Sequence, residues 1–268
     1  MREYFFLLGA DDPEMQMIAM LLAKHDQPFA YATVGARRAN PRDAYAADPI
    51  EVPGGHQLVL VECEPRELPA DFIRIDHHRP GDPGYSKGPP EYWSASSIGQ
   101  LHILLGIPPT EHARIMAAYD HCFAAAMRGE CEGVATGAVL AKKMVLLVQR
   151  TKTNWTEVKV HIEYYRRIIE DSPMIMVGKQ EIRDMRHIDL GAGYSFDLLV
   201  VQVAAATGRH GVLLRHSGHD NGPEQWTITG HTLPHTIEYW MSVWAPEQEL
   251  VDIYGVPARG YAGGYKAP

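Results

Sequence analysis

The sequence predicts an α/β protein in which a mostly parallel sheet forms the N-terminal domain, followed by a helical connector and a smaller α+β domain. Short apolar runs near the N-terminus alternate with a helical segment and long polar crossovers, a pattern typical of buried parallel strands. The middle of the chain has helical spacing, and strand-like runs return from Met174. At 268 residues the chain can form one large domain or two modest ones.

Apolar runs of strand length mark the N-terminal domain. Tyr4–Leu8 is a compact apolar run bounded by Gly9, and it predicts a buried strand. Met15–Lys24 contains no helix breaker, so we expect a helix to begin just after Pro13. Further strands are expected at Phe29–Val34, Gln57–Glu62 and Phe72–Ile75, with a polar stretch at residues 35–55.

Helical spacing and capping residues then predict a series of helices. Ser96 or Ser97 can cap a helix that ends at Gly106, and Thr110 opens another that carries Asp120. Later helices are expected at Val134–Gln149 and, after the capping pair Asn154 and Glu157, up to Asp171.

Strand signals return after this helical region. We expect strands at Met174–Val177, Gly211–Arg215 and Gln225–Thr229, a buried helix at Leu198–Ala206, and a hairpin turn at residues 220–223. The glycine-rich tail 258–268 is expected to be mobile.

Composition limits the classes of function. The formal net charge of -8 argues against a broad electrostatic grip on long nucleic acids. The cysteines Cys63, Cys122 and Cys131 are widely spaced, with no metal-type or redox-type pair in the sequence, which suits a reducing cytosol. The apolar run at the N-terminus is too short for a signal peptide, and no later run reaches transmembrane length. We therefore expect a soluble cytoplasmic protein.

Acidic residues follow the predicted parallel strands. Glu14, Glu62 and Asp76 lie at or just beyond the carboxyl ends of strands, the edge at which open α/β sheets bind ligands. Polar residues commonly end strands, so an ordinary strand end is the alternative. We expect the three acids to converge.

The triplet Asp76-His77-His78 ends the last of these strands. Neighbouring side chains on an extended segment point to opposite faces, so the two histidines cannot do the same job. Asp120 lies in an alanine-rich helix, where burying an acid is costly unless it is paired or binds a metal. A surface position on that helix is the alternative.

Carboxylates combined with imidazole suit manganese or magnesium better than a thiolate zinc site. A two-metal centre would relieve the repulsion among the acids, activate a water and hold a phosphate oxygen, while His78 or Arg79 neutralises charge on a substrate. An acidic sheet edge without metal is the competing interpretation. The predicted ligands are Asp12, Glu14, Glu62, Asp76, His77 and Asp120.

The sequence resembles the DHH phosphoesterase superfamily in the order and spacing of five features. These are the acidic loop, the acid after a later strand, the triplet, the Ser96-Ser97 helix start and the helical Asp120. The resemblance covers roughly residues 4–130. That superfamily includes oligoribonuclease/phosphoadenosine-phosphate phosphatases, RecJ-like exonucleases and family II pyrophosphatases. The resemblance implies a two-domain phosphoesterase with a dimanganese cleft.

The resemblance also implies residue roles. Glu62 matches the acid that bridges both metals, a position that is usually Asp, while His77 and Asp120 match metal ligands and His78 matches the histidine that contacts substrate. The first motif departs from the family pattern, because Ala10 replaces a histidine when Pro13 is aligned. In that alignment Glu14 and Gln16 replace the two acids of the family motif. If Asp12 and Glu14 are aligned with those acids instead, both ligands are kept. Fewer than two ions is therefore an alternative to the dimetal site.

The C-terminal domain resembles the superfamily's substrate-binding domain less clearly. Arg215 can supply its strand arginine, and Gly230-His231 a remnant of its glycine-rich loop. We predict catalytic roles for His78, Arg79 and Arg215, and substrate binding by Ser96, Ser97, His216, Gly230 and His231. Zinc binding by the histidines 216, 219, 231 and 235 and plain surface polarity are the alternatives.

The function predicted is a metal-dependent phosphoesterase that hydrolyses small nucleotides or short oligonucleotides through a metal-activated water. The alternative is a catalytically degenerate DHH-fold protein that binds a nucleotide or another phosphorylated ligand. We expect Mn²⁺ or Mg²⁺ as cofactor and neither a membrane nor long duplex nucleic acid as partner, and the sequence leaves a homodimer open. The predicted divisions are a DHH-like phosphoesterase domain at residues 1–150, the connector at 151–173 and the substrate-binding domain at 174–268.

Overall fold

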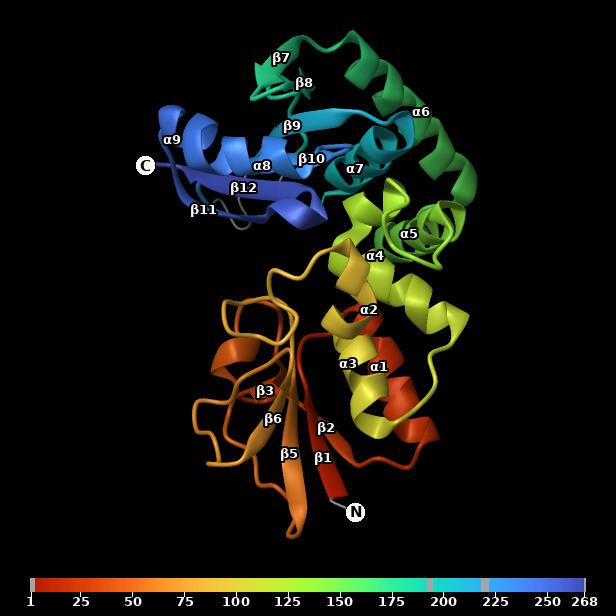
Figure 1. Ribbon diagram of the computed structural model, residues 1–268, viewed down its shortest axis with the longest axis vertical. Coiled ribbons are helices and arrows are strands. Elements are labelled where there is room, and N and C mark those ends of the chain that lie inside the picture. The colour runs from red at the N-terminus through yellow and green to blue at the C-terminus, as the bar shows by residue number, and fades with distance from the viewer. Residues whose placement is uncertain (1–2, 192–194, 218–221, 268) are drawn as a thin grey trace. The chain divides into compact units, whose positions relative to one another are not determined.

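The computed structural model describes residues 3–191, 195–217 and 222–267. The chain divides into two compact units, Met1–His121 and Cys122–Pro268, and each is described by itself (Figure 1). The predicted α/β class is confirmed. The division falls inside helix α4 (Glu111–Met127), whereas the helical pattern placed a boundary at residue 150.

The first unit is built on a parallel sheet with the strand order β2–β1–β5–β6. Its central strands are apolar and bury residues on both faces, as the continuous hydrophobic runs predicted. The run predicted at Phe29–Val34 is divided at Ala32, after which the chain forms a small hairpin. The sheet strands are β1 (Glu3–Leu8), β2 (Phe29–Tyr31), β5 (His56–Val61) and β6 (Phe72–Ile75), and the hairpin strands are β3 (Thr33–Val34) and β4 (Arg37–Arg38).

Different kinds of structure cover the two faces of this sheet. Helices α1 (Pro13–Lys24) and α3 (Ser97–Leu105) pack together on one side, and the segment with β3 and the 3₁₀ turn η1 (Ala44–Ala46) lies on the other (Figure 1). On that second side Ala39, Ala44 and Ala47 pack against leucines of β1 and β5. The turn η2 (Pro89–Glu91) and the short helix α2 (Tyr92–Ala95) lead into α3, which ends at the left-handed Gly106 as expected.

The second unit contains a mixed sheet with the strand order β11–β12–β10–β9–β8–β7. Its strands are β7 (Met174–Val177), β8 (Gln180–Asp184), β9 (Gly211–His216), β10 (Gln225–Gly230), β11 (Leu250–Val256) and β12 (Tyr261–Lys266). Strands β9 and β10 pair antiparallel, as the hairpin signal predicted, although residues 218–221 of that turn lie outside the described residues.

Alternating side chains of β9 bury both faces of this sheet. Val212 and Leu214 join a core with helices α5 (Thr136–Thr151), α6 (Trp155–Asp171) and α7 (Phe196–Gly208). Leu213 joins the opposite core with α8 (Pro234–Tyr239), the π-helical turn η4 (Trp240–Trp244) and α9 (Ala245–Glu247). Helix α6, predicted as a connector, therefore contributes to the core of the second unit.

The described part of the glycine-rich tail forms a turn and a paired strand, so the expectation of a mobile tail was wrong. After the turn η5 (Pro257–Arg259), β12 lies between β11 and β10. A side chain at Gly263 would clash with the hydroxyl of Tyr254, so the glycine allows the neighbouring strand to pack closely. Within the described ranges, no helix combines the length and apolar character needed to cross a bilayer.

Candidate metal centre

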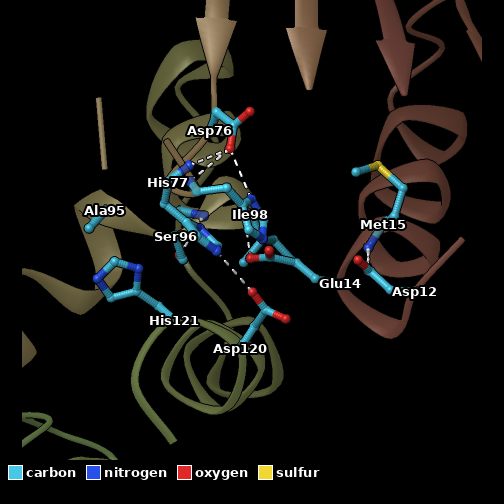
Figure 2. Close-up of polar contacts among 12 residues, drawn as sticks. Asp12, Glu14, Met15, Asp76, His77, Ala95, Ser96, Ile98, Asp120 and His121 are labelled. Atoms are coloured by element: carbon cyan, nitrogen blue, oxygen red, sulfur yellow. Dashed lines mark hydrogen bonds and ion pairs between the residues drawn. The ribbon is translucent and has the colours of Figure 1, made fainter. Parts of the chain in front are cut away.

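Four chain segments place acids and histidines at one edge of the parallel sheet. Glu14 lies in the first turn of α1, which follows β1, and Glu62 follows β5. His77 comes just after β6, and Asp120 projects from α4 (Figure 2). The shared edge follows from the parallel direction of β1, β5 and β6.

Glu14, Glu62, His77 and Asp120 form one cluster. Each offers one ligand atom, and these atoms all lie within 4.8 Å of one another. Nε2 of His77 lies 3.3 Å from Oδ2 of Asp120, and Glu14 and Glu62 are buried. An overlapping group contains Glu62, His77 and His78.

The buried carboxylates lack the donors that their charge requires. Oε1 of Glu14 accepts a hydrogen bond from the backbone N of Ile98 at 3.0 Å, whereas Oε2 of Glu14 and Oε1 of Glu62 find no hydrogen-bond partner among the described residues. Burial raises the pKa of Glu14 well above its ordinary value, and Asp120 and Glu62 raise it further. Burial likewise raises the pKa of Glu62 to about 8, against the lowering effect of His78.

Asp120 shows the opposite behaviour. Burial works to raise its pKa, but the His77 ring and the charge of His78 lower it to about 2. The cluster thus combines an acid whose pKa is lowered with acids whose pKa is raised. Three carboxylates and one imidazole form a donor set that fits Mn²⁺ or Mg²⁺, so the residues fit the metal that the sequence predicted.

Asp76, predicted as a ligand, lies outside this cluster. Its Oδ1 accepts hydrogen bonds from the backbone N of His77 and of His78 at 2.7 and 3.0 Å and contacts Nδ1 of His78 at 3.0 Å. Its Oδ2 accepts the hydroxyl of Tyr45 at 2.9 Å. The carboxylate folds back over the turn that follows it, so Asp76 orients the two histidines and is not placed to bind the ion.

His78 and Arg79 bring positive charge to the rim of the cluster. The His78 ring stacks on His77 at 4.3 Å between ring centroids, and its side chain is 48% exposed. Burial lowers the pKa of His78, but Asp76 and Glu62 overcome this effect and raise it to about 9. Arg79 is exposed, with its guanidinium carbon 3.3 Å from the centroid of the Tyr45 ring.

The first motif, the stretch of residues 10–16 after β1, contributes one residue to the cluster. Asp12 caps α1 by accepting the backbone N of Met15 at 2.7 Å and does not join the cluster. Burial and Asp120 raise the pKa of Asp12 to about 6. Ala10 is buried, and Gln16 donates to Asp11 on the surface. Of the residues weighed in that motif, the structure brings only Glu14 together with the other ligands.

The two serines predicted to bind substrate are buried inside the first unit. Ser96 caps α3 by accepting the backbone N of Gly99 at 3.2 Å, and its hydroxyl donates to the carbonyl of Trp93. Ser97 is fully buried, and its hydroxyl helps to lower the pKa of Glu62, which burial raises. Both serines therefore support the site from within, and the substrate role predicted for them gains no support from their placement.

A glycine permits the close packing around His77. The backbone N of Gly84 donates to the carbonyl of Asp76 at 2.9 Å. An added Cβ at Gly84 would clash with the carbonyl of Ala95 and would lie 2.7 Å from Cβ of His77. The loop after the triplet can reach this position only because residue 84 has no side chain.

The predicted residues of the second unit lie on β9 and β10. Arg215 is partly exposed, with Nη1 3.7 Å from Glu224, and the neighbouring His216 is buried. Gly230 pairs with Gly211 at the opposite end of this ladder, about 16 Å from His216 at the usual rise per residue. The structure therefore does not bring Arg215 and His216 together with Gly230 and His231.

The alternative zinc set also separates in the structure. His219 lies outside the described residues, and His216 and His231 are at opposite ends of the β9–β10 ladder. The metal-type groups found among the described residues do not include these histidines. The backbone at Gly230 is left-handed, with φ of 84°, and a side chain there would clash with the carbonyl of His210.

Sequence reasoning missed two residues beside the centre. His121 is buried, packs edge-on against His77 at 5.1 Å between centroids, and its Nε2 lies 3.1 Å from the carbonyl of Lys87. Its position next to Asp120 was the available signal. Tyr45 lies in the polar stretch between strands and carries no local signal.

Comparisons with known proteins leave the family open. No family model matches the chain, and no curated protein sequence matches it. A solved structure described as exonuclease RecJ bound to manganese is similar, with a TM-score of 0.41 and 13% identity, covering 99% of this chain and 86% of that chain. A likeness at this level carries no argument about fold or activity, so the function depends on the geometry of the site.

Proposed function

We propose that this chain is a metal-dependent phosphoesterase that hydrolyses small nucleotides or short oligonucleotides with water as nucleophile. The observation that carries the proposal is the cluster of Glu14, Glu62, His77 and Asp120, in which buried carboxylate oxygens lack hydrogen-bond donors. Such oxygens are costly to bury unless a cation binds them.

The residues divide into those that hold the ion and those that face the substrate. Glu14, Glu62, His77 and Asp120 would hold a divalent cation, which lowers the pKa of a bound water and polarises a phosphoryl oxygen. His78 presents a half-exposed imidazole beside the cluster, and hydrogen bonding by Asp76 fixes its orientation. A cationic His78 attracts a phosphate group and disfavours neutral ligands.

The charge balance favours a short substrate. A net charge of -8 argues against a broad electrostatic grip along a polynucleotide.

A second candidate function is supported by the first motif. Only Glu14 of that motif joins the cluster, while Ala10 and Gln16 lie elsewhere, which favours one ion over two. A protein with a single ion could bind a nucleotide or other phosphorylated ligand without turnover.

Metal content and hydrolysis test the proposal together. Purified protein, loaded with Mn²⁺ and separately with Mg²⁺, would be assayed on nucleotides, dinucleotides and 3′,5′-bisphosphate nucleosides for release of phosphate or mononucleotide. We expect His77→Ala and Asp120→Asn to lose both bound metal and turnover. The surface variants His25→Ala and Asp26→Asn serve as matched controls and keep both.

The outcomes separate the two candidates. Stoichiometric metal with turnover that disappears in His77→Ala supports the phosphoesterase. Bound metal and nucleotide binding without turnover on every substrate supports the binding protein. Absence of bound metal at saturating Mn²⁺ would overturn both versions of the metal centre.

A further inference from the structure

Tyr45 connects the side chains of His78 and Arg79 beside the metal centre. Its hydroxyl donates to Oδ2 of Asp76 at 2.9 Å, and Oδ1 of the same carboxylate lies 3.0 Å from Nδ1 of His78. The face of its ring supports the Arg79 guanidinium, whose carbon is 3.3 Å from the ring centroid. One phenol therefore fixes the positions of an imidazole and a guanidinium that are neighbours in the sequence.

Arg79 has its side-chain donors available for an anion. Its backbone N donates to Asp82 at 2.6 Å, but among the described residues no carboxylate pairs with its guanidinium. Arg38, which stacks on Tyr31 at 3.8 Å, provides the contrast. The guanidinium of Arg38 donates to the carbonyl of Gly9 and pairs with an acid, so its donors are already used.

A guanidinium stacked on a ring keeps its planar edge exposed, and that edge matches the oxygens of a phosphate. Stacking also removes rotamer freedom before the ligand arrives, so less entropy is lost on binding. An aromatic platform under Arg79 therefore favours binding of an anion with several oxygens.

We propose that Tyr45 is a positioning residue that presents the Arg79 guanidinium and, through Asp76, the His78 imidazole as a clamp for a phosphate group. This clamp deepens the proposed function and rests on it for the identity of the substrate. It assigns to Arg79 those phosphate oxygens of the substrate that are not bound by the metal centre. The ligand class is a phosphate or phosphomonoester dianion.

Calorimetric titration with inorganic phosphate, with and without Mg²⁺, tests the clamp without requiring turnover. We expect Arg79→Ala and Tyr45→Leu each to weaken phosphate binding about tenfold or more, as for loss of a charged hydrogen bond. Tyr45→Phe retains the ring and is expected to restore affinity to within about threefold of wild type. Arg114→Ala removes an arginine stacked on Trp93 at 5.4 Å and serves as the matched control, with unchanged affinity.

Each outcome bears on the clamp separately from the enzyme. If Tyr45→Leu binds phosphate as tightly as wild type, or if Tyr45→Phe and Tyr45→Leu lose equal affinity, positioning by the ring is refuted. A wild-type protein that does not bind phosphate also refutes it. If the protein hydrolyses substrate and Arg79→Ala binds phosphate as tightly as wild type, the clamp alone is refuted. If Arg79→Ala weakens phosphate binding but the wild-type protein shows no turnover, the enzyme proposal alone is refuted.

Two thiols in the second unit carry an independent inference. The sequence offered no redox-type pair, but the fold places Sγ of Cys122 3.0 Å from Sγ of Cys131, and both are buried. Cys122 has φ of -151° and ψ of 48°, which breaks the helical geometry of α4 at that residue. Cys63 is equally buried, but its thiol donates to the carbonyl of Leu7.

The geometry points to a reversible intrachain disulfide between Cys122 and Cys131. A disulfide needs about 2.05 Å between sulfurs, so the thiols must approach by only about 1 Å. With hydrogen peroxide as oxidant, one thiol attacks the peroxide to form a sulfenic acid and release water. The second thiol then attacks that sulfur, forming the S–S bond and releasing a second water, so two thiols and one peroxide give one disulfide and two waters.

Peptide mapping after peroxide treatment of the intact protein, with and without later reduction by a dithiol, tests this pair. We expect a Cys122–Cys131 linkage that the reductant removes, while Cys63 stays a thiol and acts as an equally buried internal control. Cys131→Ser is expected to leave Cys122 without an internal partner and to abolish the linkage. Equal oxidation of all three cysteines, or sulfinic acid at Cys122 in the absence of a linkage, would overturn the proposal.

Discussion

Replacing Glu62 by glutamine is expected to flatten the dependence of stability on pH in the metal-free protein. Burial, with Asp12 and Asp120, raises the pKa of Glu62 from 4.5 to about 8. Between these values the folded protein keeps a proton on this carboxyl that the unfolded chain releases. The stability that this group contributes is complete below about pH 4.5 and is lost as the pH rises through about 8.

The magnitude follows from the linkage relation. One proton kept by the folded state lowers the free energy of unfolding by about 1.4 kcal/mol for each pH unit in this window. For a domain of this size 1 kcal/mol moves the melting temperature by roughly 2–4 °C. Glu62 alone should therefore lower the melting temperature of the wild type by about 3–6 °C per pH unit.

Thermal unfolding in chelated buffers between pH 5.5 and 8 measures this slope. Glu62→Gln, which cannot ionise, should lose that part of the slope, and the exposed Glu51→Gln should keep it. Saturating Mn²⁺ should flatten the wild-type curve, because a cation replaces the proton at the buried carboxyl. A Glu62→Gln curve with the wild-type slope would show that Glu62 does not carry the buried proton, and the metal-centre argument would then lose its main electrostatic support.

Further predictions concern packing and orientation. Gly84→Ala should destabilise the protein by about 1–3 kcal/mol in chemical denaturation and weaken Mn²⁺ binding, because the added Cβ has no room beside His77. Gly54→Ala adds its Cβ in open space and should leave both properties unchanged. Asp76→Asn should retain bound metal but lower the pKa of His78 from about 9, which NMR titration measures. Loss of the metal in this variant would instead indicate that Asp76 is a ligand. Gly230→Ala should cost about 1–3 kcal/mol, because a left-handed residue gains a side chain against a backbone carbonyl, and a neutral result in denaturation would refute that reading.

Much of the first unit could be predicted because its signals are local. The apolar runs at β1 and β5 report strands buried on both faces, and strands that run parallel must end at one edge. The positions of Glu14 and Glu62 at that edge follow directly. The second unit was harder, because β12 contains glycines that resemble a flexible tail until the neighbouring strand is in place.

The roles within the triplet could not be read from the sequence. Alternation along a strand predicted opposite faces for His77 and His78, but β6 ends at Ile75 and the two rings stack, with 4.3 Å between their centroids. Alternation also does not show that the Asp76 carboxylate turns back onto the following backbone N–H groups. That orientation depends on Tyr45, which is 31 residues away in the chain. For the serines at the start of α3 the sequence predicted both a helix cap and substrate binding, and the structure confirms the cap at Ser96.

The sequence by itself determined the main strands and helices of the first unit, their order and the edge at which the acids gather, because periodicity and strand direction are properties of short segments. Only the tertiary structure decided which of those acids meet, because each contact joins residues far apart in the chain. Glu14 reaches the backbone of Ile98 across 84 positions, and Tyr45 holds both Asp76 and Arg79. Cys122 and Cys131 are nine residues apart, and only the tertiary structure shows that their thiols meet.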